Sequence, residues 1–171
     1  AVSNWGGTLG LTPVKIFHKG YYDHMEESHE LLVSYGNEKI WDVLAENPRN
    51  RVVVFGEQPE MLRFPCSTQS YTDIEGSGGN FNLSSSPEAL AEFFTFAGVD
   101  HIYLGSGYLK SGTDGFRNVT GLLKQGYLSD LLYENGNGLA VFSPEPRELS
   151  AEESEALLAE FTEKYWPGEQ Q

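Results

Sequence analysis

Four polar side chains follow the predicted strands of this chain and are well placed to contact a ligand. Glu57 comes after an apolar run, and Glu75 comes after a second strand candidate. Ser106 and Tyr108 lie in a glycine-rich loop after a third. In open α/β sheets, ligands bind beyond the carboxyl ends of the parallel strands, where such loops converge. These four residues are therefore the candidate ligand-binding residues, with the Tyr108 ring available to stack on a sugar or another flat ligand.

The same residues allow a hydrolase or transferase but form no complete catalytic signature. Most glycoside hydrolases use two carboxylates that flank the scissile bond, and Glu57 and Glu75 offer such a pair. Ser106 lies between two glycines after a strand, yet the sequence has no G-x-S-x-G nucleophile elbow. We assign no catalytic residue, and enzymatic activity of the isolated chain stays open.

Cofactor and metal sites have little support in the motifs. The chain has neither G-x-G-x-x-G after its first buried strand nor G-x-x-x-x-G-K-[ST] anywhere. His24 and His29 are five residues apart, which would put them about 140° apart around a helix, whereas helical zinc pairs are four apart. Cys66 is the only cysteine, so no disulfide within the chain and no cysteine-rich metal site is available. We expect neither a cofactor nor a metal.

The charge of the chain restricts its partners. The sequence has 25 acidic and 11 basic residues, a net charge of −14. Such a surface repels phosphate backbones and anionic lipid headgroups, so we expect no nucleic-acid partner. No run of about 18 apolar residues occurs, so the sequence as given predicts neither a membrane span nor a signal peptide. Asn82 and Asn118 each fit the N-glycosylation acceptor pattern.

Two apolar segments should form the centre of a sheet and position the candidate residues. Arg51–Phe55 is β-branched and almost continuously apolar, as in a parallel strand covered on both faces. The segment Gly98–Gly105, G-V-D-H-I-Y-L-G, contains a second short buried strand. The helix between them starts at the S-x-x-E box Ser85–Glu88 and stops at Gly98. The pattern predicts a strand–helix–strand unit whose two strands lie side by side and parallel.

The remaining segments complete an α/β pattern. Residues 1–20 read as an extended lead-in, Tyr22–Tyr35 as a helix, and Asn37 as the cap of a second helix that ends at Asn47 and Pro48. Ser70–Ile74 is the second strand candidate, and a loop over residues 75–86 follows it.

The C-terminal third begins with a short helix through Val119 and Leu123 that ends near Gly126. Leu128–Tyr133 and Leu139–Phe142 flank the turn N-G-N-G and predict a hairpin at the sheet edge. The box at Ser150 then opens a helix within a C-terminal tail, residues 144–171. We expect a single domain over residues 1–171: a three-layer, Rossmann-like α/β fold whose small, mostly parallel sheet has helices on both faces and an antiparallel edge hairpin.

The order of these segments resembles a known family. Residues 47–56, N-P-R-N-R-V-V-V-F-G, then Gly98–Gly105, then Leu131–Gly136 running into Leu139–Phe142, are similar to the soluble C-terminal domain of large bacterial multi-pass membrane proteins related to the GT-C class of glycosyltransferases. The likeness covers roughly residues 35–143. It implies that the multi-pass portion carries the acidic catalytic residues and the lipid-linked sugar site, while this domain lies outside the cytoplasm. No position here matches a catalytic residue of that family.

The resemblance thus predicts an extracytoplasmic accessory or glycan-contacting domain of a membrane-bound, glycosyltransferase-like protein, with no catalysis of its own. Its expected partners are a glycan or cell-wall polymer and the transmembrane portion of the parent chain. Two alternatives stay open. One is a free-standing hydrolase or transferase that acts at the loop from Gly105 to Tyr108. The other is a protein-interaction domain that binds through its aromatic-rich surface.

Overall fold

The structure, a computed structural model, describes residues 36–56, 62–76 and 84–165. The predicted lead-in over residues 1–20 and the predicted helix Tyr22–Tyr35 lie outside the described residues. So do Glu57 and Asn82.

The sheet is built around the two segments that the sequence places at its centre. Its strand order is β2-β1-β3-β5-β4, with bounds β1 Arg51–Phe55, β2 Ser67–Ser70, β3 His101–Leu104, β4 Leu128–Glu134 and β5 Asn137–Phe142. β1 pairs in parallel with both β2 and β3, and Val53 lies opposite Ile102. β5 pairs antiparallel with both β3 and β4. The predicted α/β class and the parallel central pair are confirmed. The sheet is mixed and not mostly parallel as predicted, because among the described strands the two parallel pairs are matched by two antiparallel ones.

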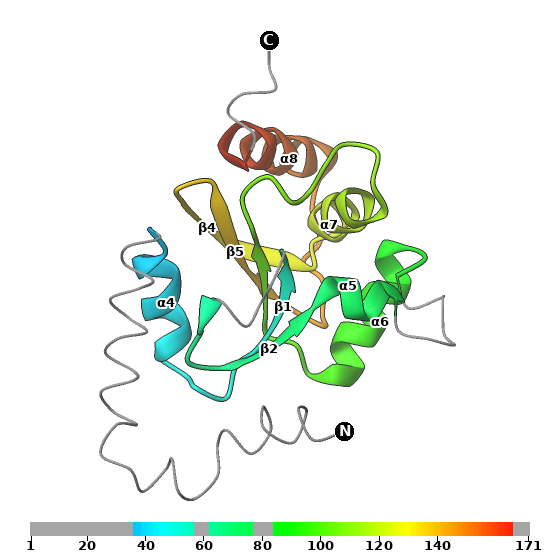
Figure 1. Cartoon of the computed structure of the whole chain (residues 1–171). Helices are drawn as coiled ribbons and strands as arrows, with labels where there is room; N and C mark the ends of the chain where they lie inside the picture. The colour runs from blue at the N-terminus through cyan, green and yellow to red at the C-terminus, as the bar shows by residue number, and fades with distance from the viewer. Residues whose placement is uncertain (1–35, 57–61, 77–83, 166–171) are drawn as a thin grey trace, which may run out of the picture.

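Residues of the central strands alternate between two clusters of buried side chains. The helices are α4 Glu38–Ala45, α5 Tyr71–Gly76, α6 Pro87–Ala97, α7 Asp114–Lys124 and α8 Ala151–Tyr165 (Figure 1). Val52, Val54 and Tyr103 pack with Ile40 and Leu44 of α4. The intervening strand residues pack with side chains from α5, α6, α7 and α8. Because successive strand side chains point to opposite faces, this alternation explains why β1 is apolar at consecutive positions.

The predicted strand over Ser70–Ile74 is wrong. β2 ends at Ser70, and α5 begins at Tyr71. Tyr71 and Ile74 are both buried, at 1% exposure each. Residues three apart lie on the same side of a helix but on opposite faces of a strand, so one core can bury both only if the segment is helical. Glu75 consequently lies within a short helix and does not follow a strand end.

Both predicted capping boxes open helices. Before α6, the capping residue is Ser86 and not Ser85: its Oγ accepts from the Ala89 amide at 3.2 Å, and Pro87 follows as the first helical residue. Gly98 closes this helix in the left-handed conformation, with φ 64°. Before α8, the reciprocal pair is complete, because Ser150 Oγ accepts from the Glu153 amide and the Glu153 carboxylate accepts from the Ser150 amide.

The C-terminal strands form the predicted hairpin at the sheet edge. Its turn residues Asn135 and Gly136 have φ of 49° and 79°, the conformation of a type I′ turn. β4 is the outer strand, and its pairing shifts between Ser129 and Leu132, next to Asp130 with φ 47°. This bulge and its charged residue interrupt the regular edge on that side.

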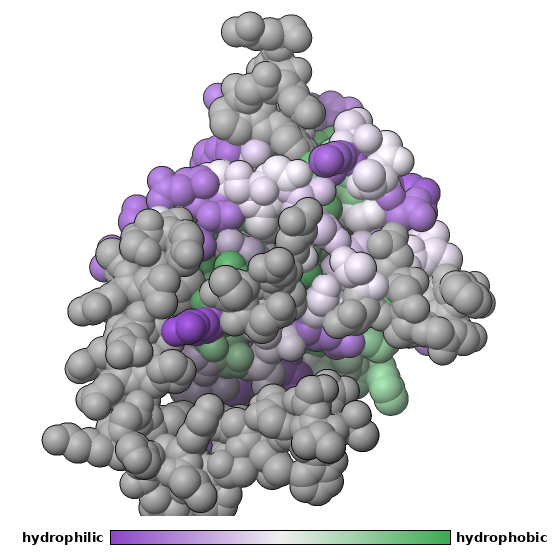
Figure 2. Space-filling model, in the orientation of Figure 1, coloured by the Kyte–Doolittle hydropathy of each residue, from purple (hydrophilic) through white to green (hydrophobic). Residues whose placement is uncertain are grey.

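Among the coloured residues on the face shown in Figure 2, purple and near-white ones cover more of the surface than green ones. Across the described ranges, no helix has both the length and the apolar character needed to cross a membrane.

Candidate functional site

The structure places the four candidate residues in different settings. Glu57 is outside the described ranges, and the side chain of Glu75 in α5 is not among those described. Ser106 and Tyr108 both lie in the loop between β3 and α7. The candidate site is therefore built from this loop and its neighbours.

A pocket of about 320 Å³ lies beside this loop, beyond the end of β3. We call it the Tyr108 pocket; it is lined by Tyr71, Gly107, Tyr108, Leu109, Lys110, Thr113 and Gly115. Its wall comes from the loop, from the first residue of α5 and from the first turn of α7. The pocket lies next to Tyr108, and the binding of a ligand there stays a prediction.

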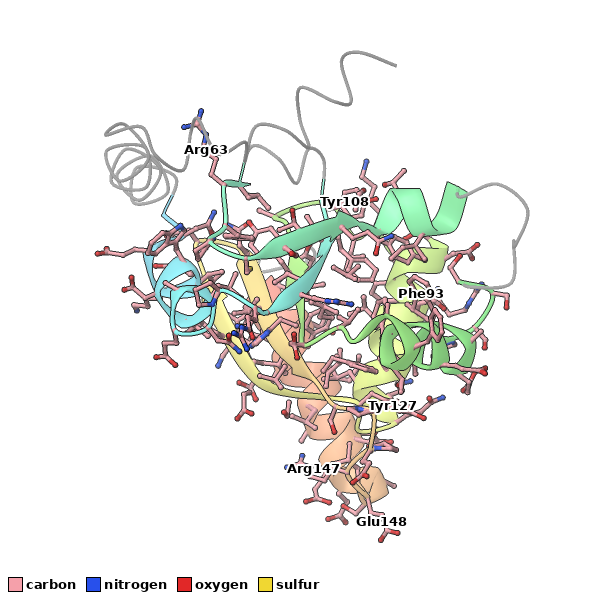
Figure 3. All side chains as sticks on the ribbon, turned by 90° about the horizontal axis from the view of Figure 1, so that it is seen from below. Arg63, Phe93, Tyr108, Tyr127, Arg147 and Glu148 are labelled. Atoms are coloured by element: carbon pink, nitrogen blue, oxygen red, sulfur yellow. The ribbon has the colours of Figure 1, made fainter. Side chains whose placement is uncertain are left out.

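Tyr108 bridges the loop to α5. Its hydroxyl is 2.8 Å from Thr72 Oγ1, and either group can be the donor. Figure 3 shows Tyr108 close to the junction of β2 and α5. The ring is half-buried and its backbone amide donates to the Gly105 carbonyl at 3.2 Å. Tyr108 is therefore held at both its backbone and its hydroxyl, while part of its surface stays accessible.

Tyr71 forms a rigid part of the pocket wall. Its ring stacks on Phe55 with centroids 4.2 Å apart, and its hydroxyl accepts from Asn118 Nδ2 at 3.0 Å. The same Nδ2 donates to the Ser84 carbonyl at 2.8 Å. Asn118 is 0% exposed, so the folded chain does not present this glycosylation pattern to an enzyme.

Ser106 faces the hairpin and does not line the pocket. Its amide donates to Asn137 Oδ1 at 2.8 Å, and a Cβ built on Gly136 would lie 2.8 Å from Ser106 Oγ. His101, the one histidine within the described ranges, is at the opposite end of β3. Roughly 13 Å of extended strand separates it from the loop, too far for it to act as a base toward Ser106.

The other titratable groups near the strands have structural environments. Burial lowers the pKa of His101, against a smaller opposite effect of Asp100, which favours the neutral ring. Burial, with Asp100 second, raises the pKa of the Cys66 thiol to about 11. The thiolate is therefore scarce at neutral pH, which disfavours a nucleophilic role. No group of three or more His, Cys, Asp or Glu side chains that could hold a metal occurs in the part of the chain that the structure describes.

Sequence reasoning missed several residues of this site. The pattern over Ser70–Ile74 predicts a strand at Tyr71, and no motif marks Lys110 or Thr113. Tyr165 belongs to the predicted C-terminal tail, residues 144–171, yet its hydroxyl donates to the Gly105 carbonyl at the base of the loop. The helical burial spacing of Tyr71 and Ile74 was a signal that could have found the first; nothing local marks the hydroxyl of Tyr165.

Comparisons with known proteins add no further assignment. No family model matches the chain, and neither a curated protein nor a solved structure is significantly similar to it.

Proposed function

We propose that this chain is a non-catalytic binding domain that contacts a carbohydrate in the Tyr108 pocket. The observation that carries the proposal is the composition of that pocket, which is lined by both the half-buried Tyr108 ring and the exposed Lys110. A sugar presents an apolar C–H face and many hydroxyls, which an aromatic ring and a few hydrogen-bonding groups recognise together.

The lining favours binding over hydrolysis. Among the described residues, no Asp, Glu or His lines the pocket. Glycoside hydrolysis requires an acid and a second carboxylate on either side of the bond. The amine of Lys110 can donate hydrogen bonds to a ligand, but it supplies no such pair.

The resemblance to the GT-C-related membrane proteins gives this binding domain a setting. On that basis the domain is an extracytoplasmic accessory of a membrane-bound glycosyltransferase-like parent, and its ligand is an acceptor glycan or a cell-wall polymer. The two core clusters, formed by alternate strand residues, support a single three-layer domain. A complete gene that encodes many apolar segments before Ala1 would agree with this setting, and a gene without them would exclude it.

Binding can be tested on the isolated chain. We would screen it on an array of bacterial glycans and titrate the best binder into ¹⁵N-labelled protein. Tyr108→Ala should weaken binding at least tenfold, because it removes the stacking ring. Phe96→Ala is the matched control, since Phe96 is an aromatic residue that is 89% exposed on α6 and does not line the pocket. No binding by the unmodified chain, or equal binding by both variants, would exclude the proposal.

A second candidate function, protein interaction, is favoured by a different surface. A hollow of about 390 Å³ lies between β2 and the end of α6, and its lining includes Thr68, Gln69, Ala97 and Val99. Phe96 lies next to Ala97 in the chain, and Figure 2 shows hydrophobic surface in the region of α6. Among the strands within the described ranges, β2 is the terminal one of the sheet order, so an extended peptide could add to it. Selection of peptides by display, followed by mapping of shifted amides, would test this: the amides of β2 should respond.

A further inference from the structure

We propose that Tyr165 is a positioning residue for the Tyr108 pocket: its hydroxyl fixes the loop Gly105–Leu109 and couples that loop to helix α8. This inference rests on the proposed function in one respect, because it takes the Tyr108 pocket as a ligand site. Tyr165 is the last residue of α8, and its hydroxyl donates to the carbonyl of Gly105, sixty residues away in the chain. Tyr165 thus contacts the loop from α8, an element that does not line the pocket.

The Gly105 carbonyl is the point at which the loop turns. It accepts from the Tyr108 amide at 3.2 Å as well as from the Tyr165 hydroxyl. A carbonyl oxygen has two lone pairs, so both bonds can be made at once. Gly107, between the two ends of this turn, has φ +70°. This is the position where a type II turn requires glycine, and the turn sets the direction of the Tyr108 side chain.

The start of the loop is already anchored to the sheet. The Gly105 amide donates to the Phe55 carbonyl at 2.8 Å, and a Cβ on Gly105 would lie 3.2 Å from that oxygen. The sheet thus fixes the amide side of Gly105, and Tyr165 fixes its carbonyl side. Beyond Gly105, the Ser106 amide donates to Asn137 Oδ1, and the Tyr108 hydroxyl lies 2.8 Å from Thr72 Oγ1.

Tyr165 is itself held rigidly. It is 3% exposed, and its ring stacks on Phe161 with centroids 5.4 Å apart and an angle of 10° between the rings. Phe161 is 1% exposed in the larger core cluster. The hydroxyl therefore occupies a fixed position and does not move with the loop. Its bond to Gly105 thus restrains the loop.

The phenol is a hydrogen-bond donor at physiological pH. Burial raises the pKa of Tyr165 to about 12, although hydrogen bonds from the amides of Leu109 and Tyr108 favour the ionised form.

The consequence is a coupling between α8 and the pocket. If the C-terminal end of α8 separates from the core, the loop loses the hydroxyl and Tyr108 loses its fixed direction. By thermodynamic linkage, a ligand that prefers the fixed loop must strengthen the packing of α8 to the same extent.

The test compares two tyrosine-to-phenylalanine variants. Tyr165→Phe keeps the ring and its stacking on Phe161 but removes the hydroxyl. Tyr133→Phe is the control, because the Tyr133 ring lies beneath Lys164 of α8 and its buried hydroxyl has no partner among the described residues. Amide hydrogen exchange is measured without ligand. We expect the amides of Tyr108 and Leu109 to exchange at least tenfold faster in Tyr165→Phe and unchanged in Tyr133→Phe.

The amides of Val53 and Ile102, in the sheet centre, separate a local change from a global one. Unchanged exchange at Tyr108 and Leu109 in Tyr165→Phe would overturn the inference, and so would equal acceleration at all four amides. Binding of the array-selected glycan should also weaken at least threefold in Tyr165→Phe and stay unchanged in Tyr133→Phe. A chain that binds no glycan, but whose loop amides respond only to Tyr165→Phe, would exclude the proposed function and still support the positioning role.

Discussion

Asn137 and Asn37 are a hundred residues apart in the chain, and Nδ2 of Asn137 donates to Oδ1 of Asn37 at 2.8 Å. The two amides join three elements. Asn37 Nδ2 donates to the Tyr103 hydroxyl at 3.4 Å, and Asn137 Oδ1 accepts from the Ser106 amide. These bonds connect the start of α4, the C-terminal end of β3 and the hairpin. The Tyr108 pocket lies beyond the same end of β3.

Asn137→Ala should therefore destabilise the fold. It leaves the side-chain oxygen of Asn37, a residue only 3% exposed, without its donor, and the Ser106 amide without its acceptor. A buried polar group that loses its partner costs about 1–3 kcal/mol. Urea unfolding would measure the change in the free energy of unfolding. Asn47→Ala is the control: its exposed side chain accepts from the nearby Arg49 amide, and we expect a loss below about 1 kcal/mol.

The same contacts show where sequence reasoning ends. Asn37 precedes α4 as predicted, but its side chain makes no capping bond. The carboxylate of Glu134 instead accepts from the amides of Lys39 and Ile40, about a hundred positions away. Local patterns could predict the central strands, the capping boxes and the N-G turn, because those signals lie within a few neighbouring residues. A cap supplied from another element leaves no such local signal.

For the same reason, the sequence predicts only part of the candidate site. Glycines after a buried strand are visible in the sequence, and ligands bind beyond strand ends, so the pattern indicates the loop with Ser106 and Tyr108. The pattern does not determine which side chain meets a cavity. Tyr108 lines the pocket, while Ser106 turns to the hairpin. Tyr165 enters through tertiary packing alone.

Gly121→Ala should destabilise the contact between α6 and α7. Helix propensity alone favours alanine over glycine by about 1 kcal/mol. An added Cβ, however, would lie 2.2 Å from Pro87 Cγ, and the proline ring cannot rotate away. We expect the overlap to dominate, with a net loss of about 1–3 kcal/mol in urea unfolding.

Combining Pro87→Ala with Gly121→Ala tests whether the overlap with the proline ring causes the loss. The double variant should lose less than the sum of the two single changes, because the ring that causes the overlap is gone. A stabilised Gly121→Ala chain would show that the helices can separate enough to accept the methyl group.

The Cys66 thiol should react slowly and make the fold sensitive to alkali. Its folded pKa is about 11 against an ordinary 9.0, so the thiolate fraction at pH 8 is on the order of a hundredfold lower than in the unfolded chain. Iodoacetamide should modify the native chain correspondingly more slowly than the urea-unfolded chain.

Because the folded state retains the proton that the unfolded state releases, the contribution of Cys66 to stability is complete below pH 9 and declines as the pH rises toward 11. Cys66→Ser should remove this part of the alkaline loss, and an identical pH profile for the two chains would contradict it.

Asn118→Asp should create a pH-dependent defect behind the pocket wall. Asn118 is fully buried, its Nδ2 donates to Tyr71 and Ser84, and its Oδ1 has no partner among the described residues. Aspartate at this position would bury a carboxylate without a cation and remove both donated bonds, so burial should raise its pKa. A raised folded pKa means that stability is retained below the unfolded pKa and lost as the pH rises. The free energy of unfolding of the variant should therefore fall further below that of the parent chain at pH 7 than at pH 4.

Asn118→Leu, which removes the same bonds without a charge, should show a deficit of about 1–3 kcal/mol that does not change between these pH values. Urea unfolding of the three chains at both pH values measures the difference, and equal pH profiles for the two variants would mean that water reaches the carboxylate.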